Sequence, residues 1–257
     1  MDNLVLAMAG GYDAATLRPF LRSLRQAGCG AQVVLFLHRN PPGTAEALRA
    51  EGAQTIEVDL PDVPETFSYN IARYPLFAAH LASSEASRVL LTDCRDVIFQ
   101  RDPFAAISGT GIHLFEEHPA RPVGNCIWTS SWIRYRYGDA ALPPVADRPV
   151  ICSGVVLGDT SPVRGYLARV VAELTPPLRA TNYMAGYDQG VVNVLCRKGE
   201  IAHLVRHPYR SAQALHLGNA PAGTVRQDAS GEVVNDAGEV VAIVHQHDRH
   251  PELRGLP

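Results

Sequence analysis

Two carboxylates stand three positions apart directly after an apolar segment in the first half of the chain. The segment 87–92 has the composition of a strand, and Asp93 and Asp96 follow it in a turn. Carboxylates that face one small volume repel each other and raise each other's pKa unless a cation neutralises them. Two carboxylates together with phosphate oxygens suit Mg²⁺ or Mn²⁺. The pattern predicts a divalent-cation site at the end of this strand.

The acidic turn also has an ordinary structural interpretation. Asp96 could cap the turn while Asp93 pairs with Arg95, and neither carboxylate would then bind a ligand. Asp102 precedes Pro103 and is expected to cap a short helix that begins there. For Asp93 and Asp96 both interpretations stay open, so other segments have to decide between them.

A second polar cluster extends from His245 to Pro251 and contains three histidines, an aspartate and Arg249. If a strand persists to His247, then His245 and His247 share one face and offer neutral imidazole to a metal. Arg249 could bind a phosphate group through two parallel hydrogen bonds. A single histidine here could equally be a surface residue, and the run also has a superficial likeness to the ligands of binuclear metallohydrolases.

Two shorter motifs lie between these clusters. Ser153 and Gly154 stand inside the apolar strand candidate 150–157, where a glycine marks either the close approach of a ligand or a bulge. Asp188 and Gln189 precede a helix-like segment. Asp188 could cap that helix, or it could hold a sugar hydroxyl or lie beneath a reacting carbon.

The elements that must position these residues alternate between strand and helix in the first half of the chain. Expected strands cover 4–9, 31–37, 55–58 and 87–92, and expected helices cover 14–27, 44–51 and 69–81, the last interrupted by Pro75. This alternation predicts a mostly parallel sheet with helices on both faces, an α/β fold. Ligands of such sheets collect beyond the C-terminal ends of the strands, where Asp93 is expected.

The second half is less regular. Strands are expected at 112–115 and 150–157, helices at 162–174 and 188–197, and a hairpin joins 232–234 to 240–244 through a turn rich in Asn, Asp and Gly. No repeat or linker divides the chain. We expect one domain over residues 1–257.

Composition narrows the class of protein. The 257 residues are 46% hydrophobic, which excludes intrinsic disorder, and a net charge of −3 argues against nucleic acid or an acidic membrane surface as a partner. No run approaches 18 apolar residues and the start lacks a signal-peptide pattern, so we expect a cytoplasmic protein with no integral membrane segment. Five widely spaced cysteines are expected to be reduced thiols.

Taken in order, the four motifs resemble nucleotide-diphospho-sugar glycosyltransferases of the GT-A fold. The family pattern reads Leu-Thr-Asp-x-Arg-Asp-x-x-Phe-Gln, Ser-Gly, Asp-Gln-Gly-x-x-Asn and His-Gln-x-Asp-Arg-His-Pro. It matches Leu91 to Gln100, Ser153-Gly154, Asp188 to Asn193 and His245 to Pro251. The chain is also similar to glycogenin-like retaining transferases, in which an Asp-x-Asp motif and a late histidine hold the metal.

The resemblance implies roles for individual residues. It assigns the metal to Asp93, Asp96 and His245, and the surroundings of the reacting carbon to Asp188 and Gln189. It assigns contacts with the donor nucleotide and its diphosphate to Tyr12, Arg73, Asp93, Arg95, Ser153, Gly154 and Arg249. The acidic motif is one residue longer than Asp-x-Asp, so either carboxylate could ligate the metal directly, and Arg249 stands where glycogenin-like enzymes use lysine.

The implied reaction is metal-dependent transfer of a sugar from a nucleotide-diphosphate sugar to an acceptor hydroxyl, with retention of configuration and with Mn²⁺ or Mg²⁺ as cofactor. Residues 1–104 would form the donor half of a single GT-A domain and 105–257 the acceptor half. The alternatives are a metal-dependent phosphoryl or nucleotidyl transferase or hydrolase, or a catalytically silent sugar-nucleotide-binding module. A nucleotidyltransferase is disfavoured because the loop 8–13 after the first strand contains no Lys or Arg.

The presumed acceptor half contains four closely spaced aromatic residues: Trp128, Trp132, Tyr135 and Tyr137. Such side chains could stack on a sugar ring. Their spacing also suits a helix packed on the core, which is the interpretation we favour.

Overall fold

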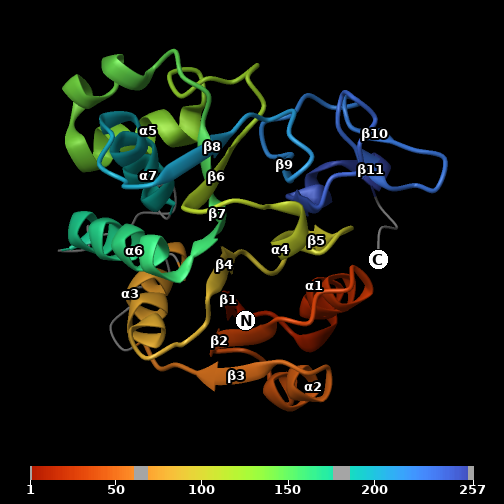
Figure 1. Ribbon diagram of the computed structural model, residues 1–257. Helices are drawn as coiled ribbons and strands as arrows, with labels where there is room; N and C mark the ends of the chain where they lie inside the picture. Colours follow the sequence, from red (N-terminus) through yellow and green to blue (C-terminus); the bar gives the residue numbers. More distant parts are fainter. Residues whose placement is uncertain (1, 61–68, 176–185, 254–257) are drawn as a thin grey trace.

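The computed structural model describes residues 2–60, 69–175 and 186–253 (Figure 1). Its central sheet has seven strands in the order β3-β2-β1-β4-β7-β6-β8. The strands are β1 (Asn3–Gly10), β2 (Gln32–His38), β3 (Gln54–Glu57), β4 (Arg88–Thr92), β6 (Ile112–Glu116), β7 (Ile151–Asp159) and β8 (Leu204–His207). Only β7 runs antiparallel to its neighbours, β4 and β6. The predicted mostly parallel α/β sheet is confirmed, and strands from both halves of the chain share it as one domain.

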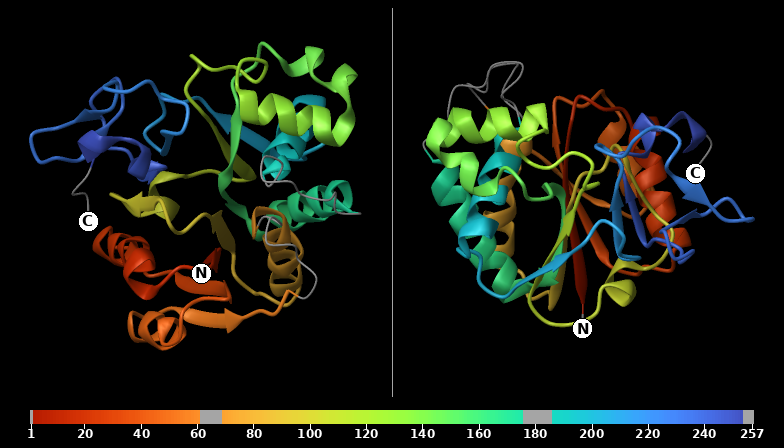
Figure 2. Two further views of the ribbon diagram at one scale, coloured as in Figure 1. Left: turned by 180° about the vertical axis from the view of Figure 1, so that it is seen from behind. Right: turned by 90° about the horizontal axis from the view of Figure 1, so that it is seen from above.

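Helices cover both faces of this sheet, as the right-hand view of Figure 2 shows. One face carries α3 (Tyr69–Ala82), α6 (Thr160–Leu174) and α7 (Tyr187–Lys198), with α5 (Ile127–Tyr137) packed on α7; the other carries α1 (Ala14–Gln26) and α2 (Thr44–Ala50). Alternation along β1 explains the two cores. Leu4, Leu6 and Met8 face the first group of helices, while Val5 and Ala7 face the second.

A smaller sheet joins the acidic turn to the C-terminal segment. It consists of β5 (Val97–Phe99), β12 (Ile243–His245) and β9 (Ala214–His216), with β12 in the middle. β12 runs antiparallel to β5 and parallel to β9, so His245 lies opposite both Val97 and His216. This pairing brings segments almost 150 positions apart into contact, because residue 97 starts β5 and residue 245 ends β12.

The remaining elements are short. They are α4 (Pro103–Ala106), β10 (Arg226–Gln227), β11 (Val233–Val234) and the 3₁₀ turns η1 (Asp139–Ala141), η2 (Pro143–Val145), η3 (His247–Arg249) and η4 (Pro251–Leu253). The predicted cap of α4 is confirmed, since the Asp102 side chain accepts a hydrogen bond from the Phe104 N–H at 3.0 Å. No helix in the described ranges has the length and apolar character needed to cross a membrane. All five cysteines are buried and unpaired.

Two expectations about individual elements need correction. The chain does return antiparallel to β11 through the turn 235–238, where Val234 bridges Val240 and the Val241 N–H donates to the Val233 carbonyl at 3.0 Å, but residues 243–245 leave this hairpin and pair with β5 and β9. Pro75 does not interrupt α3, although proline removes one hydrogen bond of a helix. The face of α3 formed by Tyr74 and Phe77 is almost completely buried, and this packing holds the helix together.

Candidate functional site

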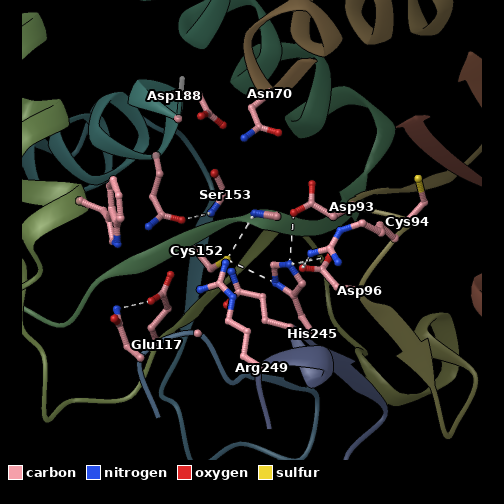
Figure 3. A pocket seen from close by; sticks show the side chains of 18 of the residues that line it. Asn70, Asp93, Cys94, Asp96, Glu117, Cys152, Ser153, Asp188, His245 and Arg249 are labelled. Carbon is pink, nitrogen blue, oxygen red and sulfur yellow. Dashed lines mark hydrogen bonds and ion pairs between the residues drawn. The ribbon is translucent and has the colours of Figure 1, made fainter. Parts of the chain in front are cut away.

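A polar cavity of about 440 Å³ opens at the C-terminal ends of β1 and β4 (Figure 3). In the strand order these two strands mark the point where the chain turns from one side of the sheet to the other, which is where open α/β sheets bind ligands. Every site residue expected from the sequence lines this cavity: Tyr12, Arg73, Asp93, Arg95, Asp96, Ser153, Gly154, Asp188, Gln189, His245 and Arg249.

Strand pairing brings the acidic turn, β7 and β12 together. The Asp93 N–H donates to the Gly154 carbonyl at 2.8 Å, which extends the β4–β7 pairing past the end of β4. The Gln246 N–H donates to the Asp96 carbonyl at 2.7 Å, next to the pairing of β12 with β5. The backbone therefore fixes the positions of three side chains that converge from separate segments.

Asp93, Asp96 and His245 offer two oxygens and one nitrogen that all lie within 4.8 Å of one another. The Nε2 atom of His245 is 3.2 Å from Asp93 Oδ2 and 3.7 Å from Asp96 Oδ1. It is buried and has no hydrogen-bond partner among the described residues. An imidazole nitrogen in this place can pair with the two carboxylates when it is protonated and can ligate a metal when it is neutral. The mixed oxygen and nitrogen set fits Mn²⁺ better than Mg²⁺, which prefers oxygen ligands.

Gly154 makes room for this group. A Cβ at this position would meet the His245 ring and would lie 2.6 Å from Asp93 Oδ2. Any larger residue would push apart the groups that face the candidate metal position. The bulge interpretation of this glycine is confirmed, because the β6–β7 register shifts between the pairs Leu114–Val156 and Glu116–Ile151, on either side of Gly154. The approach of a ligand stays a prediction.

The second ring nitrogen of His245 contacts two other buried side chains. Its Nδ1 lies 2.9 Å from Nδ1 of His216 and 3.6 Å from Sγ of Cys152, and all three side chains are buried. Burial and the neighbouring His245 hold the pKa of His216 well below its usual value, so His216 is neutral and can accept the Nδ1 proton of His245. Nε2 of His245 then faces the carboxylates. Burial lowers the pKa of His245, but Cys152, Asp96 and Asp93 hold this pKa well above its usual value, so a metal that binds here has to displace a proton from Nε2.

Arg73 links two of the carboxylates. Its buried guanidinium pairs with Asp93, lies 3.1 Å from Asp188 Oδ2 and donates to the Ser153 carbonyl at 3.1 Å. The structure thus contradicts the interpretation in which Asp93 pairs with Arg95. Burial by itself raises the pKa of Asp93, but Arg73 and His245 lower it by more, so Asp93 stays ionised.

Asp188 occupies the first turn of α7 without capping the helix. Its carboxylate is 1% exposed and accepts hydrogen bonds from Arg73 and from the Tyr74 hydroxyl, each at 3.1 Å. Burial raises the pKa of Asp188 to about 6, although the Arg73 guanidinium acts in the opposite direction. A buried carboxyl with a raised pKa at the wall of a polar cavity is characteristic of functional sites.

The rest of the Asp-Gln-Gly-x-x-Asn motif docks α7 on β7. Asn193 is completely buried and its side chain bonds both the N–H and the carbonyl of Ile151, each at 2.8 Å. Gly190 has Trp132 so close that a Cβ would lie 3.0 Å from the Trp132 backbone. The Gln189 Oε1 accepts from the Ser153 N–H at 3.3 Å. These contacts fix α7 against its neighbours and thereby hold Asp188 and Gln189 at the cavity.

Two arginines line the outer part of the cavity. Arg95 bridges Asp248 at 2.7 Å and Asp96 at 3.1 Å, which ties η3 to the acidic turn. The side chain of Arg249 rises from η3 toward the cavity (Figure 3). A Cβ on Gly218 would lie 2.8 Å from Arg249 Nη1, so this glycine gives the guanidinium its space.

No protein-family model matches this chain, and no curated protein is significantly similar to it. The chemistry of the site therefore has to follow from its geometry.

The other histidines of the C-terminal cluster do not join the metal group. Strand β12 ends at His245 and Gln246 takes a left-handed conformation with φ 63°, so the expected sharing of a face by His245 and His247 is wrong. His250 is buried away from the cavity, where its Nε2 lies 2.9 Å from the Leu217 carbonyl.

The aromatic group divides between the core and the cavity. All four residues lie on α5, as expected, and Tyr135 and Tyr137 pack against the core. Trp128 and Trp132 line the cavity, with ring centroids 6.3 Å apart, and Trp128 is 48% exposed. The predicted packing on the core is thus confirmed for Trp132, Tyr135 and Tyr137, whereas Trp128 lies outside the core.

The sequence did not point to several residues of the site. The cavity is also lined by Asn70, Glu117, Arg121, Cys126, Cys152 and Asn219, and His216 lies behind His245. Glu117 had a usable signal, because it follows a predicted strand as Asp93 does. His216 had none, since a short strand with one histidine does not reveal its long-range partner.

If His216 fixes the ring of His245, its removal should weaken metal binding. We expect His216→Ala to lower the Mn²⁺ affinity by roughly 10- to 100-fold, as loss of a buried partner of a metal ligand does. His216→Asn, which retains an acceptor oxygen, should recover most of this loss. Isothermal titration with Mn²⁺ measures the affinity, and thermal unfolding checks the fold. Equal Mn²⁺ affinity of the Ala variant and the unaltered protein would contradict this role.

Proposed function

We propose that this protein is a metal-dependent glycosyltransferase with a GT-A type of fold, which moves a sugar from a nucleotide-diphosphate donor to an acceptor hydroxyl with retention of configuration. The observation that carries the proposal is the convergence of Asp93, Asp96 and His245 on one polar cavity at the sheet's switch point. The approach of Arg249 to the same cavity supports it. The order of the four sequence motifs points to the same class of reaction.

The reaction is slow without a catalyst because opposite charges develop as the bond breaks. When the glycosidic bond to the diphosphate breaks, negative charge grows on the leaving oxygen while the sugar becomes cation-like. Asp93, Asp96 and His245 would hold Mn²⁺ or Mg²⁺, which supplies Lewis-acid stabilisation of the diphosphate when bound. Arg249, which lines the same cavity, would add a positive charge beside the diphosphate.

Arg73 and Asp188 are assigned to the part of the reaction in which the sugar becomes positively charged. Arg73 keeps Asp93 ionised, because its buried guanidinium pairs with that carboxylate. Asp188 shares the same guanidinium from the opposite side. We assign Asp188 to the side of the sugar where positive charge develops, with Gln189 beside it, because both line the cavity from the start of α7.

We place the nucleotide of the donor at the loop that follows β1. Tyr12 and Gly10 line the cavity beside the acidic turn, and the Tyr12 carbonyl accepts a hydrogen bond from Asn40 at 2.7 Å that fixes the loop. A phenol at this position can stack on a nucleotide base. Ser153 and Gly154 then lie between the nucleotide and the reacting sugar.

The direct assay offers UDP-glucose, UDP-galactose, GDP-mannose and ADP-glucose with Mn²⁺ and measures release of nucleoside diphosphate. We expect turnover with one donor class, loss of turnover on chelation, and a drop of at least about 100-fold in Asp96→Asn, since each ~1.4 kcal/mol of lost transition-state stabilisation is tenfold in rate. Asp147→Asn serves as the control, because that carboxylate is 80% exposed and lies outside the cavity. Full turnover without a divalent ion would refute the metal-dependent mechanism.

Asp188 should matter for transfer and not for holding the nucleotide. We expect Asp188→Asn to lower the transfer rate at least about tenfold, or ~1.4 kcal/mol, while the affinity for nucleoside diphosphate with Mn²⁺ changes little. The physical reason is that the substitution removes a charge near the reacting carbon and leaves the metal group intact. Transfer kinetics and equilibrium titration separate the two quantities. A parallel loss in both would show that Asp188 only supports the structure.

A further inference from the structure

Glu117 is a buried carboxylate on the cavity wall that the proposed chemistry does not use. It follows the last residue of β6, its N–H donates to the Val150 carbonyl at 2.8 Å, and the residue is 4% exposed. The buried Asn219 donates a short hydrogen bond to its Oε2. In Figure 3 Glu117 lies on the far side of the cavity from Asp93 and Asp96.

The other carboxylates of the cavity have cationic partners. Asp93 and Asp188 share Arg73, and Asp96 pairs with Arg95. Among the residues that the structure describes, no Arg, Lys or His nitrogen forms an ion pair with Glu117. Its nearest polar neighbours, Asn219, Cys152 and Gln189, are uncharged.

Burial without a counter-ion is costly for a carboxylate. Burial raises the pKa of Glu117, while His245 and Arg249 act in the opposite direction from a greater distance than an ion pair. A side chain in this state gains from hydrogen-bond donors, and its position on a cavity wall allows a ligand to provide them.

The surroundings select the kind of donor. Arg249 lines the same cavity and acts on Glu117, so an ammonium group placed between the two would meet repulsion from the guanidinium. An anionic group would meet the Glu117 carboxylate itself. Neutral hydroxyl groups satisfy both conditions, because they donate to a carboxylate and accept from a guanidinium.

Aromatic side chains complete the surroundings. Trp128 and Trp132 line the same cavity from α5, and Trp128 is about half exposed. Indole rings pack well against the apolar face of a ring whose edge carries polar groups. Carboxylate, amide and indole therefore form a set that suits a neutral, ring-shaped polyol.

We propose that Glu117 and Asn219, together with Trp128 and Trp132, form a subsite for a sugar ring, in which the Glu117 carboxylate accepts hydrogen bonds from the sugar hydroxyls. The sugar belongs either to the donor or to the acceptor of the reaction proposed above, and to that extent the inference rests on the proposed function. The hydroxyl-binding chemistry is the same in both cases.

The chain has a built-in reporter for this subsite, because Trp128 and Trp132 are its only tryptophans. Intrinsic fluorescence therefore reports binding at the subsite whether or not the protein catalyses transfer. The probes are UDP, UDP-glucose, GDP and GDP-mannose, each with Mn²⁺, and free glucose, galactose, mannose and N-acetylglucosamine. We expect at least one sugar-bearing probe to change the fluorescence in a saturable way.

The variant Glu117→Gln removes the charge and keeps the shape. We expect sugar affinity to fall by roughly 10-fold or more, as loss of a hydrogen bond to a charged group does. Glu116→Gln is the matched control, since the neighbouring Glu116 pairs with Arg197 at 3.2 Å outside the cavity. It should bind sugars like the unaltered protein. If Glu117→Gln proves unstable in thermal unfolding, Trp128→Ala at the exposed edge takes its place, with Trp132 as the remaining reporter.

The affinities also identify which sugar is bound. If Glu117→Gln weakens UDP-glucose or GDP-mannose but leaves UDP and GDP unchanged, the subsite holds the donor sugar. If the nucleotide sugars bind normally and the affinity for a free sugar falls, it holds the acceptor.

Two further outcomes separate the subsite from the proposed function. Binding of free sugars that depends on Glu117, without any binding of nucleotides, would support the subsite and remove the proposed donor. Sugar affinities that are the same in the unaltered protein, Glu117→Gln and Trp128→Ala would overturn the subsite and leave the metal site untouched.

Discussion

The site depends on one strand, β12, being held between β5 and β9. This pairing places the imidazole of His245 against Asp93 and Asp96 on one side and against His216 on the other. Two carboxylates this close are unfavourable without positive charge between them, which a protonated His245 or a bound cation supplies. The same backbone pairing that completes the small sheet therefore assembles the candidate metal group.

Charge compensation organises the rest of the cavity. Arg73 is buried at the centre, where it pairs with Asp93 from the acidic turn and with Asp188 from α7, so a single guanidinium couples the two ends of the site. Breaking such a pair by removing one partner leaves an uncompensated buried charge, which ties the geometry of both carboxylates together. Glu117 differs from the cavity's aspartates, because its partner is the amide of Asn219 and not a cation. The difference separates a region suited to phosphate and metal from one suited to neutral hydroxyls.

Local signals in the sequence predicted the large sheet and its helices well. Periodicity located β1 to β4, α1 and α6, and the Asp102-Pro103 pair correctly predicted the start of α4. The small sheet could not be predicted, because its strands are three residues long and their partners lie far apart in the chain. The hairpin after β11 was predicted, but the departure of residues 243–245 from it to the small sheet was not, for the same reason. The predicted site residues came from the order of the motifs. His216 could not be predicted, because a distant partner leaves no mark on the local sequence, and Glu117 had only its place after a predicted strand as a signal.

The central claim is that one cation binds between the acidic turn and β12. The most direct measurement is a crystal structure with Mn²⁺ and a nucleoside diphosphate, with data collected where manganese scatters anomalously. The account predicts an anomalous peak at coordination distance, about 2.0–2.4 Å, from Nε2 of His245 and from an oxygen of Asp93 or Asp96. A peak elsewhere, or a bound nucleotide with no peak at all, would contradict it.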